Sequence, residues 1–147
     1  MPIFPTQYST LSSIALKDKI QKNYGFAELS CRLLIHNVSD TYLLENQQEK
    51  YIFRIYRDAH RKLEEIKAEV ELLNILKDNG ARVSYPINDL QGSPIQSFQA
   101  AEGIRYGVLF SFARGRVVYD LNQPQLEVIG QEMAKIHNLT STIQLKH

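Results

Sequence analysis

The sequence contains one cysteine, almost no excess of charge of either sign and no long apolar run. Cys31 alone can form neither an internal disulfide nor a cysteine metal cluster, and we interpret it as a small buried residue of a strand. The net charge is +1 with Lys and Arg spread along the chain, which argues against nucleic acid or an anionic membrane as a partner. Without an apolar run of about 18 residues or a charged, then apolar leader, the sequence is typical of a soluble cytoplasmic protein.

The apolar residues that are present suffice for one domain. Of the 147 residues, 44% are hydrophobic, which is enough for a core of its own. Helical and alternating periodicities predict helices at 9–23, 58–79 and 124–137, and strands at 27–35, 41–44, 51–57, 95–100 and 104–110. Tight links join the first three strands, so we expect them to form an antiparallel meander.

The third predicted strand carries a cation on a face that should be covered. Successive strand side chains alternate, so Ile52, Arg54 and Tyr56 share one face. A guanidinium in such surroundings needs an anionic partner, because an unpaired charge removed from water costs on the order of several kcal/mol. The next helix, for which Asp58 is the expected cap, places Glu69 at the edge of its apolar stripe. We therefore expect an Arg54–Glu69 pair, and an ion pair with a purely structural role is the alternative.

Five segments of the sequence are each weak evidence for a family when taken alone, but their order and spacing together are more specific. They are Arg32–Tyr42, Tyr51–Arg57, Glu69–Leu76, Val108–Gly115 and Ile129–His137. Over roughly 26–139 the chain resembles the nucleotide-binding lobe of the aminoglycoside phosphotransferase and choline kinase family, which is related to the protein kinases. Within that family it resembles type-II homoserine kinases and bacterial stress-response kinases most.

This resemblance implies a fold and a division of the chain. The fold is α+β: a protein-kinase-like N-terminal lobe with a five-stranded antiparallel sheet and one long packed helix, plus an N-terminal helix and the first helix of a second lobe. The division gives a helical extension at 1–25, the nucleotide-binding lobe at 26–110, a hinge at 111–116 and the truncated start of a C-terminal lobe at 117–147.

The resemblance also implies a phosphate site. Arg54, oriented by Glu69, is expected to contact the α- and β-phosphates of ATP. The family often has lysine at this position, so the charge is kept while the geometry of the donor changes. Ser39 and Asp40 correspond to the loop over the phosphates, although this link contains no glycine. A plain turn, with Asp40 bonded to the local backbone, is the alternative for that link.

The adenine is expected to lie against apolar side chains of the sheet, with its edge on the hinge backbone. By this resemblance Val38 and Ile52 would contact the ring and Phe110 would close the back of the pocket. Backbone groups of Ser111 and Ala113 would meet the polar edge of the base. For each apolar residue, ordinary core packing is the competing role.

The residues that catalyse phosphoryl transfer in this family are not found in the sequence. Its His-Gly-Asp-type loop and acidic metal-binding motif lie in the second lobe, and none of the ten residues after His137 is Asp or Glu. Neither His36 nor His137 is assigned a catalytic role. We expect this segment to be inactive alone, and the full-length protein to use ATP and Mg2+ to phosphorylate a hydroxyl of a small molecule.

Two other functional classes stay open. The chain could be a non-catalytic, kinase-like interaction or regulatory domain, in which an apolar helix stripe docks on a partner or forms a homodimer. That stripe consists of Leu126, Ile129, Met133 and Ile136. Alternatively, the meander and helix belong to an unrelated α+β binding module.

Overall fold

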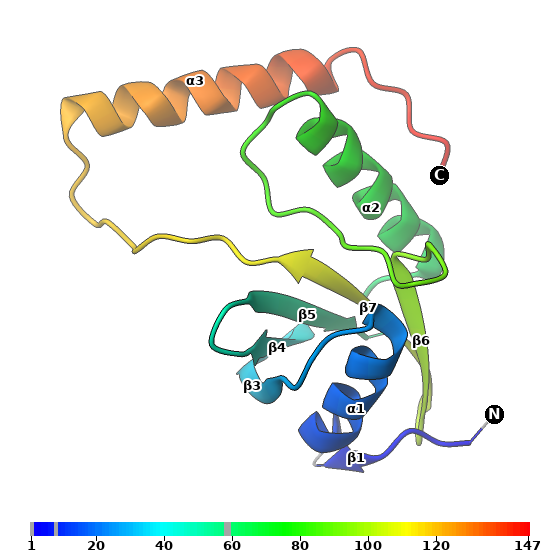
Figure 1. Cartoon of the computed structure of the whole chain (residues 1–147). Coiled ribbons are helices and arrows are strands. Elements are labelled where there is room, and N and C mark those ends of the chain that lie inside the picture. The colour runs from blue at the N-terminus through cyan, green and yellow to red at the C-terminus, as the bar shows by residue number, and fades with distance from the viewer. Residues whose placement is uncertain (1, 8, 58–59) are drawn as a thin grey trace.

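The computed structural model describes residues 2–7, 9–57 and 60–147 and has an α+β fold (Figure 1). The strands of its antiparallel sheet are, in spatial order, β3 (Ser30–His36), β4 (Ser39–Glu45), β5 (Lys50–Tyr56), β7 (Gly103–Ser111) and β6 (Ile95–Ala100). The remaining elements are the short pair β1 (Thr6–Gln7) and β2 (Thr10–Leu11) and the helices α1 (Ser13–Tyr24), α2 (Leu63–Asp78) and α3 (Gln123–Thr140). The predicted fold class, including the five-stranded sheet and the long packed helix, is confirmed.

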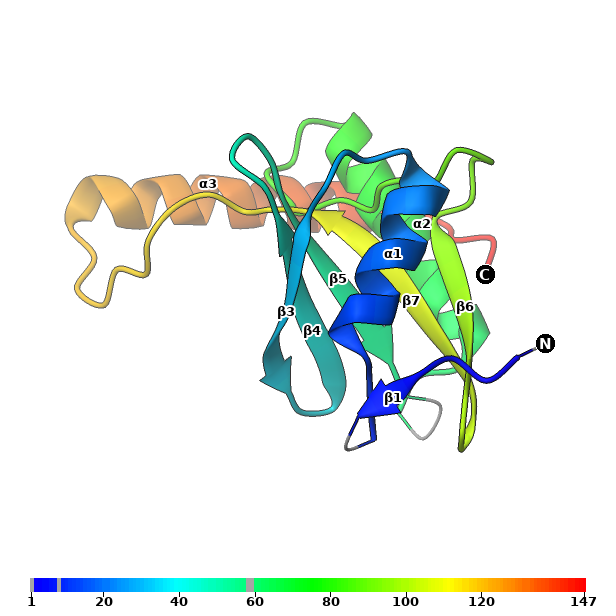
Figure 2. The same cartoon turned by 60° about the horizontal axis from the view of Figure 1, so that its bottom comes forward.

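The two faces of the sheet pack against different helices, as Figures 1 and 2 show. Phe53 and Ile55 of β5 belong to the core beneath α1. Ile52 and Tyr56, from the alternate positions of the same strand, pack with α2 residues such as Ile66. The alternation predicted for this strand is therefore correct, and Arg54 lies on the face covered by α2.

The boundaries of α2 differ from the prediction at one end. The helix begins at Leu63, because the Glu65 carboxylate accepts a hydrogen bond of 2.8 Å from the Lys62 backbone N–H and closes the first turn. Asp58, the expected cap, lies outside the described residues. The other end agrees with the prediction: Gly80 follows the helix with φ of 77°, a conformation that favours glycine.

The first hairpin differs more. β3 starts three residues later than expected and has an irregularity between Leu33 and Ile35, which accounts for the blurred alternation around Leu34. β4 is seven residues long instead of four, because its whole length pairs with β5. Residues 39 and 40 are thus part of a strand and point to opposite faces.

The segment after β7 leads away from the sheet to α3. This helix begins beside Asn122, whose side chain accepts a hydrogen bond of 3.0 Å from the Gln125 N–H, and it runs three residues beyond the predicted end. α3 meets the end of α2 through Lys135 Nζ, 3.3 Å from Gly80 O. None of its residues is buried. Among the described residues, no helix is both long and apolar enough to cross a membrane.

Candidate functional site

Arg54 and Glu69 form the ion pair that the sequence predicted. Arg54 Nη1 lies 3.2 Å from Glu69 Oε1, and the side chains are 40% and 28% exposed. The guanidinium carbon also lies 5.3 Å from the ring centroid of Phe110, within the range of a cation–π contact. The pair is therefore half-open to solvent, and the cation keeps donor groups for another anion.

A second hydrogen bond fixes the carboxylate. The Tyr56 hydroxyl donates to Glu69 Oε2 over 3.2 Å, so the two oxygens of Glu69 bind two residues of the same strand. Burial raises the pKa of the Tyr56 phenol, and the neighbouring Glu69 charge raises it further. The hydroxyl thus stays a donor, and Glu69 is held by the rigid sheet on one side and by α2 on the other.

Two adjoining hollows meet at this ion pair. The larger has a volume of about 400 Å³ and is lined by Ile52, Arg54, Glu69, Leu73, Val83, Ser84, Phe110, Ser111 and Ala113. The smaller has a volume of about 160 Å³ and is lined by Val38, Ser39, Arg54, Tyr56, Arg57, Arg61 and Glu69. Every residue predicted for the site except Asp40 therefore lines one hollow or both. Val38, however, was predicted to contact the base beside Ile52, and it lines the smaller hollow and not the larger one. The larger hollow is mainly apolar, whereas arginines converge on the smaller one.

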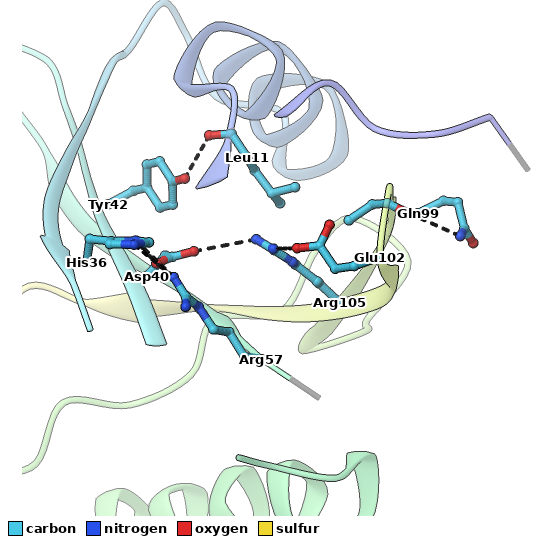
Figure 3. Close-up of polar contacts among 9 residues, drawn as sticks. Leu11, His36, Asp40, Tyr42, Arg57, Gln99, Glu102 and Arg105 are labelled. Atoms are coloured by element: carbon cyan, nitrogen blue, oxygen red, sulfur yellow. Dashed lines mark hydrogen bonds and ion pairs between the residues drawn. The ribbon is translucent and has the colours of Figure 1, made fainter. Parts of the chain in front are cut away.

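Asp40 lies elsewhere, and its predicted place at the phosphates is wrong. β4 alternates, so Ser39 points to the cleft and Asp40 to the opposite face, where its side chain is 0% exposed. The alternative of a local backbone hydrogen bond is not what the structure shows either. Its carboxylate instead contacts His36, Arg57 and Arg105 (Figure 3).

The backbone of the segment predicted as a hinge, 111–116, is partly hydrogen-bonded within the chain. The Ser111 N–H donates to Tyr85 O over 2.9 Å, and the Ser84 hydroxyl donates to Ser111 O. The Ser111 carbonyl oxygen retains a second lone pair that could accept a hydrogen bond from a ligand. The Ser111 N–H is already bonded to Tyr85 O and is not free for a ligand. Of the two backbone positions predicted to meet a base, Ala113 is thus the one whose N–H has no bond among the described residues.

Several lining residues were missed by the sequence analysis. Tyr56 and Leu73 could have been found, because they share faces with Arg54 and with the buried residues of α2. Val83 and Ser84 carried no such signal. They lie in an extended connection whose position depends on its pairing with β7, as in the hydrogen bond of 2.8 Å from Ile87 N to Leu109 O.

No group of His, Cys, Asp or Glu able to hold a metal ion is present within 2–7, 9–57 and 60–147. Glu69 is committed to Arg54 and Tyr56, and Asp40 faces away from the cleft. The described residues therefore offer the cleft cations and backbone groups for an anion, and no carboxylate cluster for a cation.

A strand cation paired with a helix carboxylate, at the mouth of a cleft beneath an antiparallel sheet, is the arrangement of a kinase-like lobe. Comparison with known proteins agrees. The model of the phosphotransferase enzyme family matches residues 30–144, and the chain belongs to that family.

Solved structures share the fold. Amicoumacin kinase hAmiN, in complex with AMP-PNP, Ca2+ and Ami, superposes with a TM-score of 0.80 at 21% identity, over 92% of this chain and 42% of that one. Spectinomycin phosphotransferase APH(9)-Ia, in complex with ADP and spectinomycin, superposes with a TM-score of 0.69 at 15% identity, over 88% of this chain and 38% of that one. A microcompartment-associated aminopropanol kinase superposes with a TM-score of 0.66 at 22% identity, over 85% of this chain and 40% of that one.

Two curated relatives are longer than this chain. An uncharacterized protein of Synechocystis sp. is 37% identical over 136 residues, which are 91% of this chain and 38% of the relative. An uncharacterized protein of Deinococcus radiodurans is 30% identical over 136 residues, 92% of this chain and 39% of the relative. The chain thus spans about two fifths of the length of these relatives.

Proposed function

We propose that this chain is the ATP-binding lobe of a phosphotransferase that phosphorylates a hydroxyl of a small molecule. The observation that carries the proposal is the Arg54–Glu69 pair at the junction of the two hollows. A cation held on a strand by a helix carboxylate is suited to bind phosphate oxygens with little loss of freedom, because its position is fixed before the ligand arrives.

The two hollows fit the two parts of a nucleotide. In this proposal the base lies in the larger one, against Ile52 and Phe110, and its polar edge meets the backbone of Ala113 and the carbonyl of Ser111. The phosphates lie in the smaller one, against Arg54 and beside Ser39 and Val38. The apolar lining of the first and the converging arginines of the second support this assignment.

The remaining parts of the reaction belong to the same proposal. Mg2+ would supply positive charge that offsets the charge on the transferred phosphoryl group. Its protein ligands and the catalytic base would come from outside this chain, so that the chain alone is inactive. We further propose the division into an extension at 1–25, a lobe at 26–110, a hinge at 111–116 and the start of a second lobe at 117–147. We also propose that the protein is cytoplasmic and that it is particularly related to type-II homoserine kinases and stress-response kinases.

Nucleotide binding by the full-length protein tests the proposal. Isothermal titration calorimetry with AMP-PNP should show saturable binding, and Arg54→Gln should weaken it by about tenfold or more, the effect of losing a charge-assisted hydrogen bond. Arg32→Gln is a matched control, because Arg32 is an exposed arginine of β3 that lines neither hollow. No binding by the wild-type protein, or equal binding by Arg54→Gln, contradicts the proposal.

A second candidate function has one observation in its favour. Apolar side chains of α3 are exposed, and a hollow of about 630 Å³ lies between this helix and the segment before it. A kinase-like interaction domain without catalysis could use this surface to form a homodimer. Sedimentation velocity distinguishes the two: a dimer that Met133→Glu disrupts, together with no nucleotide binding, would favour the interaction domain.

A further inference from the structure

Asp40 is a buried carboxylate with polar or charged partners from three directions (Figure 3). Its Oδ1 lies 2.7 Å from His36 Nδ1 and 3.0 Å from Arg57 Nη2. Its Oδ2 lies 3.5 Å from Nη1 of Arg105, which is itself 5% exposed and also pairs with Glu102. These partners belong to β3, to β7 and to the residue that follows β5, so one side chain of β4 connects three strands and the segment after a fourth.

The cluster lies directly behind the turn that joins β3 to β4. His36 and Asp40 are cross-strand partners, and they flank residues 37–39. A carboxylate in the interior is strongly unfavourable without partners, so its three contacts fix where the start of β4 can lie. The turn itself adds one backbone hydrogen bond, from Asn37 N to Ser39 O over 3.2 Å.

Ser39 connects this cluster to the cleft. Because β4 alternates, the Ser39 side chain faces the smaller hollow while the next residue is anchored on the other side of the sheet. Any displacement of Asp40 therefore moves Ser39 and Val38, which line that hollow, relative to Arg54.

We infer that Asp40 is a positioning residue for phosphate binding: its contacts with His36, Arg57 and Arg105 hold the glycine-free turn 37–38 and Ser39, the first residue of β4, in place over the phosphates. The inference rests on the proposed function, because it needs phosphates in the smaller hollow. A turn without glycine has little backbone freedom to adapt to its ligand. In this protein the turn would instead be held in one position by the ion pairs of Asp40 with Arg57 and Arg105 on the other face of the sheet.

The competing explanation is that the cluster only ties the strands together. The two explanations differ in what they predict for ligands with and without the outer phosphates. Loss of a structural contact lowers the thermal stability and weakens all nucleotides alike. Loss of a positioning contact lowers the affinity for AMP-PNP and leaves the affinity for AMP unchanged, because only AMP-PNP has outer phosphates that extend under the turn.

Calorimetric titration of the full-length protein with AMP-PNP and AMP separates these cases. We expect Asp40→Asn to lower the affinity for AMP-PNP by about tenfold, the cost of a lost charge-assisted contact, with the affinity for AMP unchanged. His36→Ala should give a smaller loss of the same kind. Tyr42→Phe is the matched control: it removes the buried bond of 2.7 Å from the Tyr42 hydroxyl to Leu11 O, two residues along β4 and away from the turn (Figure 3). It should lower the melting temperature and leave both affinities unchanged.

Amide hydrogen exchange provides a readout that needs no ligand. Exchange at Asn37 should be faster in Asp40→Asn than in the wild-type protein and in Tyr42→Phe. If the carboxylate variant does not fold, His36→Ala decides the question, since the His36 side chain is 47% exposed and lines neither hollow.

The outcomes separate the inference from the function beneath it. If Arg54→Gln weakens AMP-PNP while Asp40→Asn and His36→Ala keep the wild-type ratio of AMP-PNP to AMP affinity, the positioning role is refuted and the nucleotide site stands. If the wild-type protein binds neither nucleotide, the proposed function fails and the inference fails with it.

Discussion

Arg54 and Tyr56, two positions apart on β5, bind the two oxygens of one carboxylate, that of Glu69 on α2. Each contact measures 3.2 Å, and the residues differ in what else they can reach: Arg54 is 40% exposed in the cleft, whereas Tyr56 is buried. The cation is therefore the member of the group that can meet a ligand, and the phenol is the member that supports the carboxylate. This division of roles yields separable predictions.

Under the proposed function, Arg54→Ala should strongly reduce phosphotransfer by the full-length protein without unfolding it. We expect kcat/KM of the full-length enzyme to fall by about 100-fold or more, because a fixed charge facing the phosphates is lost. Arg54→Lys keeps the charge and should retain part of the activity. A coupled ATP assay measures both, with circular dichroism as the check on folding. Unchanged turnover in Arg54→Ala would refute the assigned role.

Tyr56→Phe should affect stability more than nucleotide binding. The hydroxyl makes a partly buried bond to a charged group, and its loss should cost about 1 kcal/mol in the free energy of unfolding. Tyr106→Phe is the matched control, because Tyr106 is the cross-strand partner of Tyr56 on β7 and its hydroxyl has no bond among the described residues. Urea denaturation of the two variants gives the comparison. Equal stabilities would show that the bond to Glu69 contributes nothing.

Gly107→Ala should destabilise the sheet. A Cβ at Gly107 would lie 2.5 Å from Cε1 of Phe53 and 2.8 Å from Cδ1 of Ile55, both in the core beneath α1. Overpacking of this kind typically costs about 1–3 kcal/mol. Gly130→Ala on α3 meets nothing within 4 Å and should stabilise the helix by about 0.5–1 kcal/mol. Thermal melts in which Gly107→Ala is as stable as the wild-type protein would contradict this account of Gly107.

Cys31 should react slowly with thiol reagents in the native state. The side chain is half-buried and not fully buried as expected, and its partial burial raises the pKa of the thiol from an ordinary value of 9.0 to about 12, so little thiolate exists at pH 8. Labelling with iodoacetamide at pH 8 should be slow in buffer and fast in urea. The same shift makes unfolding easier in alkali: the unfolded chain releases the proton first, so the contribution of this group is present below pH 9 and is lost as the pH rises towards 12. Equal labelling rates in buffer and urea would contradict the burial of this thiol.

The sequence analysis succeeded where local geometry decides the outcome. The alternation of β5 put Arg54 and Phe53 on opposite faces, and the helical period of α2 put Glu69 beside Ile66 and Val70. It failed at Asp40, since the length of β4 was underestimated and the residue was placed in a loop. It also gave no signal for Ser84, whose hydroxyl binds the hinge carbonyl of Ser111.

The chain by itself determined the elements, their faces and the pairing of Arg54 with Glu69, because side-chain direction follows from the backbone periods of strand and helix. Only the tertiary structure decided what surrounds that pair. The position of the 81–94 connection against β7, and the convergence of His36, Arg57 and Arg105 on one buried carboxylate, depend on contacts between residues far apart in sequence. Such contacts are selected by burial and charge pairing in the folded state, and no local pattern encodes them.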